Sequence, residues 1–244
     1  MSQPAVAVFD LDGTVTRCDT FLRFLVGCLL RSPGRWWVAP ALAWAVAMHF
    51  AGRRDNAWLK AFFLARIVGR RPVDPVERWA DRHVDRVLES ALRPGAVAEI
   101  ARLRAEGVRL VLASASPDIY VPALARRLGF DDVICTRARR DADGRWTGVL
   151  DGGNCMGDEK LLRVAGRLAA IGLAMPAAVA YSDHHADLPL LRAAGRAFAV
   201  NPTRTLAAAA AAHGIVVVDW SGAGADRRVA TPAPGMPASP GQRR

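Results

Sequence analysis

An apolar run near the start of the chain ends in two carboxylates that stand one residue apart. Residues 6–9 are β-prone, and Asp10-Leu11-Asp12-Gly13-Thr14 follows them directly. The run predicts a short buried strand whose carboxyl end opens into a loop, where ligands bind in open α/β sheets. Two interpretations stay open on this segment alone. It is either an ordinary strand with an Asp-Gly turn, or Asp10 and Asp12 face one pocket and need a cation or a shared proton.

The length and composition suit one large domain or two modest ones. The chain has 244 residues, of which 52% are hydrophobic, so it can bury a large core. Its four cysteines show no CxxC and no pairing pattern, which favours free thiols in a reducing compartment. They are Cys18, Cys28, Cys135 and Cys155. No basic segment followed by an apolar one opens the chain, so we expect no signal peptide and a cytoplasmic location.

The positive charge of the chain is concentrated in one stretch. Residues 17–93 hold an excess of seven positive charges out of a net +10, together with five of the seven tryptophans. A basic, Trp-rich region suits nucleic acid, a phosphorylated substrate or an anionic membrane surface. No helix-turn-helix, zinc-finger or aromatic sheet motif accompanies it, so we expect no nucleic-acid partner.

Lysine is rare in this chain. Only Lys60 and Lys160 are lysines among 33 basic residues. Because most positions that need only a cation are arginine, a retained lysine hints that a compact ammonium is required there. Chance retention is the alternative.

A helical pattern runs through the region before residue 93. One helix starts near Asp19 and stops at residues 32–34, and two more are predicted over 57–68 and 74–92. Between them, residues 36–52 carry no formal charge and approach the length of a membrane span. We reject a crossing, because it would separate Asp10 from every later candidate group. The segment is then either a helix buried in a small helical domain or one lying in a membrane interface with Trp and Arg at its rim.

From residue 93 onward, helices and strands alternate. Strands are predicted over 108–113, 132–135, 177–181, 196–200 and 215–218, with a hairpin over 139–150 that turns at Asp143-Gly144. Helices are predicted over 96–106, from Ser116-Pro117-Asp118, from about Asp158, over 188–193 and from Pro202. This alternation indicates an α/β fold with a doubly wound, mostly parallel sheet.

Polar side chains recur at the expected sheet edge later in the chain. Ser114 follows the strand over 108–113, Lys160 opens a helix, and Asp183 and Asp187 follow the strand over 177–181. Each alone is ordinary, as a turn, a helix cap or a solvated lysine. Together with Asp10 they describe a nucleophile, a second carboxylate, a hydroxyl, an ammonium and a metal-binding carboxylate.

These motifs, in this order, resemble those of the haloacid dehalogenase superfamily of phosphohydrolases. The resemblance covers about residues 5–218. The motif sequences are similar to those of subfamily IB, which includes phosphoserine phosphatase-like enzymes and phosphatidylglycerophosphate phosphatases with an apolar cap. The resemblance implies a Rossmann-like core of residues 1–16 and 94–220, with an α-helical cap of residues 17–93 inserted after the first strand. Residues 221–244, rich in Pro, Gly and Ala, are expected to be disordered.

The resemblance also implies a role for each motif residue. Asp10 would attack phosphorus and form an aspartyl-phosphate, and Asp12 would act as general acid and then as general base. Ser114 and Lys160 would hold the phosphoryl oxygens. Because dehalogenases have no acid at the position of Asp12, the resemblance favours a phosphatase.

The implied cofactor is Mg²⁺. Asp10, the backbone carbonyl of Asp12 and Asp183 would hold it, with Asp187 in support. Gly13 and Thr14 would support the same loop.

Three positions depart from the phosphoserine phosphatase pattern. Ala115-Ser116 replaces Gly-Gly, Ala186 replaces Asn, and Asp19 stands where those enzymes have a Glu that meets the substrate amino group. The substrate therefore stays open between a small soluble phosphomonoester, such as a phosphoserine-like metabolite, and a lipid head group at the inner membrane face. A phosphate-binding regulator without catalysis is a further alternative. His184 and His185 either assist the metal or the substrate, or are plain loop histidines.

Overall fold

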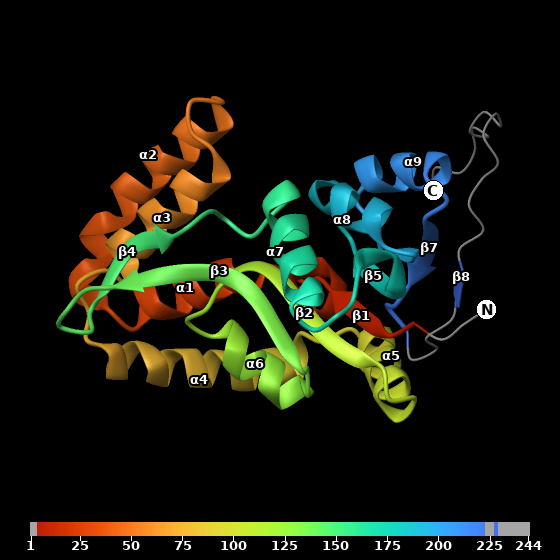
Figure 1. The fold of residues 1–244 in the computed structure, drawn as a ribbon. Helices are drawn as coiled ribbons and strands as arrows, with labels where there is room; N and C mark the ends of the chain where they lie inside the picture. The colour runs from red at the N-terminus through yellow and green to blue at the C-terminus, as the bar shows by residue number, and fades with distance from the viewer. Residues whose placement is uncertain (1–3, 223–226, 229–244) are drawn as a thin grey trace.

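A single sheet with helices on both faces forms the body of the molecule, in a computed structural model that describes residues 4–222 and 227–228 (Figure 1). Within these residues the strands lie in the order β4-β3-β2-β1-β5-β6-β7-β8. In this order the neighbouring strands β3, β2, β1, β5, β6 and β7 are parallel. Strands β4 and β8, at the two edges of the sheet, pair antiparallel. Their bounds are β1 Val6–Phe9, β2 Arg109–Pro117, β3 Asp132–Arg140, β4 Trp146–Asp151, β5 Ala178–Ser182, β6 Arg196–Val200, β7 Val216–Asp219 and β8 Arg227–Arg228. The expected doubly wound, mostly parallel sheet is confirmed.

Helices fill the connection between β1 and β2. They are α1 Thr20–Leu30, the short helix η2 Pro33–Val38, α2 Ala39–Phe50, α3 Asn56–Ile67 and α4 Val73–Ser90. Helix α5 Pro94–Ala105 completes this connection, and the later helices are α6 Val121–Leu128, α7 Asp158–Ala169, α8 Leu188–Ala193 and α9 Arg204–Ala212. The predicted helical region after the first strand is therefore present, and its limits at residues 17 and 93 stay a prediction.

The residues of β1 alternate between two hydrophobic layers, as the period of a strand requires. Val6 and Val8 pack in the layer that contains residues of α7, α8 and α9. Ala7 and Phe9 pack in the layer that contains residues of α5 and α6. All four side chains are completely buried, so β1 is fixed at the centre of the sheet.

The chain order along the sheet reverses at β1. From β1 the sheet continues through β2 and β3 on one side and through β5, β6 and β7 on the other. In open α/β sheets this switch point leaves a crevice beyond the carboxyl ends of the strands. Asp10 follows β1 and Asp183 follows β5, so the topology places both at this crevice.

The segment over residues 36–52 is not a buried helix. Its first residues belong to η2, α2 begins only at Ala39, and Ala45 is the buried residue of α2. Trp36, Trp37 and Phe50 are exposed by 56%, 70% and 84%. The uniformly apolar composition hid this outcome, because without polar residues the pattern does not show which face is covered. Figure 1 shows α2 beside α3 at the end of the molecule away from β7.

Two predicted helix starts are wrong. Residues 116–118 do not cap a helix, since β2 continues to Pro117 and the Asp118 amide donates to the Thr136 carbonyl of β3. The next helix, α6, begins at Val121 with its proline at the second position. Helix α9 begins at Arg204, not Pro202, because the Thr203 hydroxyl accepts a hydrogen bond from Leu206 N and caps it.

Glycine allows the helical region to pack closely on the body. Gly148 of β4 has a φ of 81°, and a Cβ at this position would collide with the backbone of Ala65 in α3. The neighbouring Trp146 carbonyl accepts a hydrogen bond from Arg70 N. These contacts fix α3 against the β3–β4 hairpin, on the side of the sheet where the crevice opens.

Three further expectations concern composition. Each of the four cysteines is a free thiol, as expected. In residues 4–222 and 227–228, no helix is long and apolar enough to cross a membrane. Most of the tail predicted to be disordered lies outside the described residues.

Candidate active site

The ammonium group of Lys160 connects Asp10 of the first motif with Asp187 of the last motif. Lys160 Nζ, in the first turn of α7, donates to Asp10 Oδ1 and to Asp187 Oδ2, at 2.7 Å in both cases. All three residues are buried. Burial alone would lower the pKa of Lys160, but the two carboxylates raise it above its ordinary value. Lys160 is therefore a charged group held inside the protein.

Asp183 approaches Asp10 across the loop that follows β1. Thr14 Oγ1 lies 3.3 Å from Asp10 Oδ2 and 3.2 Å from Asp183 Oδ1. Gly13 has a φ of 89°, and a Cβ there would collide with the Asp183 carboxylate. The glycine is thus required both for the left-handed backbone and for the close approach of Asp183.

Negative charge exceeds positive charge around Asp10. Burial raises the pKa of Asp10 above its ordinary value, and the carboxylates of Asp187 and Asp183 raise it further against the attraction of Lys160. Burial also raises the pKa of Asp183 to about 6. One ammonium faces three carboxylates, so the site favours an additional cation.

The donor atoms at this position fit Mg²⁺. This ion uses one or two protein carboxylates and fills its remaining positions with substrate phosphate and water. The implied set comprises the carboxylates of Asp10 and Asp183 with the backbone carbonyl of Asp12. In the part of the chain that the structure describes, no group of three or more His, Cys, Asp or Glu side chains is arranged to hold a metal.

Asp12 is fixed by hydrogen bonds to both of its carboxylate oxygens. Oδ1 accepts from the Thr20 amide and from Thr20 Oγ1, each at 2.6 Å, and Oδ2 accepts from Ser116 Oγ at 2.6 Å. The Tyr120 hydroxyl lies 2.8 Å from Thr20 Oγ1. Because the one Thr20 hydroxyl proton points to Asp12, Tyr120 donates to Thr20. Burial raises the pKa of Asp12 against these hydrogen bonds, which favours a carboxyl that exchanges a proton.

Sequence reasoning missed Thr20, Ser116 and Tyr120 as parts of the site. Thr20 is an ordinary first residue of a helix, and Tyr120 gave no signal at all. Ser116 was noticed as a departure from Gly-Gly and as an expected helix cap, although a serine two residues after a motif serine can itself reach the neighbouring strand end. The contacts of Thr20 and Ser116 with Asp12, and of Tyr120 with Thr20, depend on how α1 and β2 meet in space.

The second lysine of the chain reaches the same site from α3. Lys60 Nζ donates to the Ala115 carbonyl and to Asn154 Oδ1, the latter at 2.7 Å. It is 6% exposed, and burial lowers its pKa to about 8. Because an ammonium has three protons, one donor is left after these two hydrogen bonds. The scarcity of lysine in the sequence was the signal for this residue, while Asn154 gave none.

A cavity of about 230 Å³ lies between the helical region and the sheet edge. Asp10, Asp12 and Lys160 line its floor from the sheet side, and Asp19 and Lys60 line it from the helical side. The further lining residues are Phe21, Asn56, Ala115, Ser116, Met156, His184, Ala186 and Asp187. Of the sequence-predicted residues, Asp10, Asp12, Asp19, Lys160 and Asp187 therefore line one cavity, whereas Asp183, Gly13 and Thr14 do not line it.

Three predicted residues have more limited positions. Ser114 is completely buried in β2, where its Oγ accepts a hydrogen bond from the Ser116 amide, and it does not line the described cavity. Asp19 caps α1 by accepting from Leu22 N, and it also lines the cavity. His184 accepts from Ala186 N and has its ring against that of His185, with centroids 4.3 Å apart.

Comparisons with known proteins agree with this arrangement. The haloacid dehalogenase-like hydrolase family matches residues 7–192. Protein CicA of Caulobacter vibrioides is 34% identical over 189 residues, which cover 78% of this chain and 82% of CicA. Phosphoserine phosphatase SerB1 of Mycobacterium tuberculosis is 27% identical over 234 residues, which cover 94% of this chain and 75% of SerB1. A crystal structure of a Bordetella pertussis protein with unknown function has a TM-score of 0.79 at 26% identity, covering 90% of this chain and 100% of that one.

The fold and the site define a hydrolase with a Rossmann-like core, whose carboxylates and lysine meet at the switch point of the sheet. The chain belongs to the haloacid dehalogenase-like hydrolase family.

Replacing Lys160 by Met is expected to lower the free energy of unfolding by about 3–5 kcal/mol, because it leaves two buried carboxylates without their ammonium partner. Urea unfolding measures the loss. Lys60→Met is the matched control, since Lys60 contacts two neutral oxygens and its loss leaves no buried carboxylate unpaired. Equal losses for the two lysines would contradict the charge argument.

Proposed function

We propose that this protein is a Mg²⁺-dependent phosphomonoester hydrolase of subfamily IB that acts through an aspartyl-phosphate. The observation that carries the proposal is the pair of fixed carboxylates at one cavity. Asp10 is held by a buried ammonium, and Asp12 is held at both oxygens by Thr20 and Ser116. One carboxylate is thus presented as a nucleophile and the other as a proton carrier.

In the proposed reaction the Asp10 carboxylate attacks phosphorus, and the bond to the leaving oxygen breaks as Asp12 gives that oxygen a proton. The products of this step are an alcohol and an aspartyl-phosphate. Asp12, now ionised, takes a proton from a water molecule that attacks the phosphoryl group. Inorganic phosphate leaves and the Asp10 carboxylate is restored.

Lys160 stabilises the charge that this reaction gathers on the phosphoryl oxygens. Its ammonium is a point charge in a buried site, where such interactions are strongest. Ser114 stays in the proposed phosphate-holding set, because Ala115 and Ser116 next to it line the cavity. Mg²⁺ held by Asp10, the Asp12 carbonyl and Asp183, with Asp187 in support, would supply further positive charge there.

The cavity favours a small, soluble substrate with charges of both signs. Its volume of about 230 Å³ lies below the usual range for drug-sized ligands. Asp19 and the remaining donor of Lys60 stand at its helical wall, where they suit an amino group and a carboxylate. A phosphoserine-like metabolite has these groups, and the relationship to SerB1 supports this substrate class.

Asp10→Asn is expected to reduce hydrolysis of p-nitrophenyl phosphate in Mg²⁺ by about 10⁴-fold or more, since the amide is no nucleophile. Asp143→Asn, in an exposed turn, is the control and should keep full activity. Circular dichroism checks that both variants are folded. Activity of folded Asp10→Asn above a tenth of the wild-type rate would end the proposal.

Chelation of Mg²⁺ should likewise abolish the wild-type rate, and re-addition should restore it.

A lipid phosphate at an anionic membrane surface is the second candidate substrate. The favouring observation is the exposure of Trp36, Trp37 and Phe50 on η2 and α2, with Arg53 and Arg54 directly after them. Exposed aromatic rings beside arginines are typical of segments that lie in a membrane interface. This face adjoins α3, which carries Lys60 into the cavity.

The lipid candidate requires binding to anionic vesicles. In a flotation assay it expects recovery with phosphatidylglycerol vesicles but not with phosphatidylcholine vesicles, and loss of recovery in the Trp37→Glu, Phe50→Glu double variant. Leu162→Glu, at a residue of α7 that is 68% exposed, is the matched control and should still float. Failure of the wild-type protein to float would remove the lipid candidate and leave the soluble substrate.

A further inference from the structure

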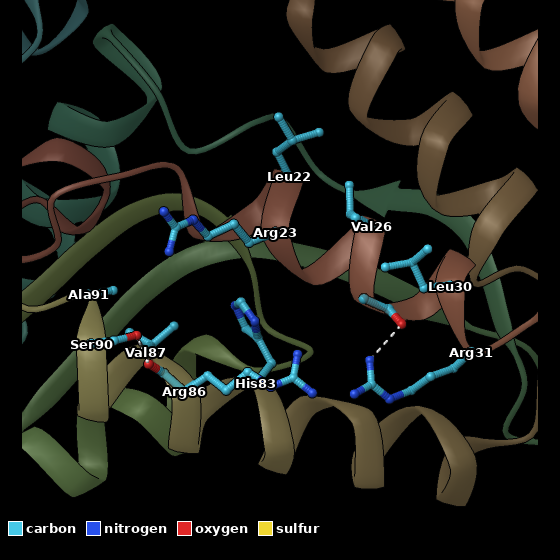
Figure 2. A pocket seen from close by; sticks show the side chains of 11 residues that line it. Leu22, Arg23, Val26, Leu30, Arg31, His83, Arg86, Val87, Ser90 and Ala91 are labelled. Atoms are coloured by element: carbon cyan, nitrogen blue, oxygen red, sulfur yellow. Dashed lines mark hydrogen bonds between the residues drawn. The ribbon is translucent and has the colours of Figure 1, made fainter.

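A second hollow lies on the outer side of the helical region, between α1 and α4. Figure 2 shows His83, Arg86 and Arg31 between the two helices, while Leu22 and Val26 extend from the side of α1 that faces away from α4. The groove has a volume of about 780 Å³ and shares no lining residue with the cavity at Asp10. It is therefore a separate feature that the proposed reaction does not use.

Apolar side chains of α1 form one wall of this groove. Leu22, Val26 and Leu30 follow the helical spacing of four residues and are exposed by 53%, 47% and 64%. Val87 and Ala91 add apolar surface from the side of α4. Over the eight helical steps from Leu22 to Leu30 the wall is about 12 Å long.

A glycine inside α1 gives the groove its depth. Gly27 lines the groove, and a Cβ built on it would meet only Arg31 Nη1 at 3.5 Å and Arg86 Nη1 at 3.9 Å. These are ordinary contact distances, so the position has room for a side chain. Glycine inside a helix costs about 1 kcal/mol relative to alanine. The chain thus gives up helix stability at the one point where a side chain would fill the groove.

The charged groups that line the groove are all positive. Arg23, Arg31 and Arg86 line it, and none of its lining residues is acidic. Arg31 is turned back along the groove, where its Nη1 donates to the Gly27 carbonyl at 2.9 Å. Within residues 4–222, Arg23 and Arg86 have no ion-pair partner. An anion in the groove would meet guanidinium groups that are free to bind it.

His83 adds a polar atom that lacks a partner. It is 6% exposed, lines the groove from α4, and its Nε2 has no hydrogen-bond partner among the described residues. Figure 2 shows its ring extending from α4 toward α1. Phe24 and Tyr120 hold the ring, with centroids 5.6 and 4.9 Å away. Buried polar atoms are nearly always paired, so Nε2 is an exception, but this nitrogen is itself shielded from solvent and is not counted as a contact for a ligand in the groove.

We propose that the α1–α4 groove binds a single-chain anionic amphiphile, such as a fatty-acid carboxylate. Its aliphatic chain covers Leu22, Val26 and Leu30, and its head group meets the arginines. The apolar wall and the uncompensated guanidinium groups together require both parts of such a molecule. A second copy of this chain fits poorly, because it would bring the same arginines against each other.

Titration calorimetry with sodium decanoate below its critical micelle concentration tests this site directly. The expected result is saturable binding of one decanoate per chain, with acetate showing none because it lacks the aliphatic chain. Decyl maltoside, which has the same chain and no charge, is expected to bind at least tenfold more weakly. Absence of saturable decanoate binding, or equal binding of decyl maltoside, would overturn the proposal.

Two variants locate the binding in the groove. Gly27→Leu fills the groove while it improves helix propensity, and Arg86→Gln removes one guanidinium. Each is expected to weaken decanoate binding at least tenfold with an unchanged or raised melting temperature. The matched controls are Gly166→Leu, at an exposed helical glycine of α7, and Arg192→Gln, at an exposed arginine of α8. Controls that weaken binding as much as the groove variants would refute the assignment, and the outcome is independent of phosphatase activity.

Discussion

The buried ammonium of Lys160 is the interaction on which the site depends. It contacts Asp10 and Asp187, which lie 150 and 27 residues away in sequence. Two carboxylates buried this close would repel each other and pay a large desolvation cost without a cation between them. The ion pair therefore fixes β1, the start of α7 and the segment after β5 relative to one another. Together with Asp183, the two paired carboxylates carry more negative charge than Lys160 neutralises, and a divalent cation can balance the surplus.

Hydrogen bonds from the helical region complete what the sheet begins. Asp12 follows the first strand, yet Thr20 at the start of α1 supplies two of its three hydrogen bonds. Lys60 of α3 in turn donates to Ala115 and Asn154 of the body. The helical region thus positions the Asp12 carboxylate and also lines the cavity. Its outer face, with exposed Trp37 and Phe50, has little part in this packing.

The sequence was sufficient for features that follow from short patterns. The strand before Asp10, the alternation after residue 93 and the gathering of Asp183, Asp187 and Lys160 at one edge all follow from local signals and strand topology. It was insufficient where tertiary contacts decide. The uniformly apolar sequence of α2 did not reveal which face of the helix is covered. Strand β2 extends beyond its predicted end at residue 113 because β3 pairs with it as far as Pro117. Thr20 reaches Asp12, and Tyr120 reaches Thr20, only through the packing of α1, which no spacing encodes.

Trapping the phosphoryl group on Asp10 tests the proposed mechanism most directly. Protein mixed with Mg²⁺ and an excess of radiolabelled p-nitrophenyl phosphate, labelled at phosphorus, is quenched in acid within one turnover and digested. The proposed mechanism predicts label on the peptide that contains Asp10, released by hydroxylamine as an acyl phosphate. Label on a serine or histidine peptide, or sustained turnover with no labelled protein, would contradict it.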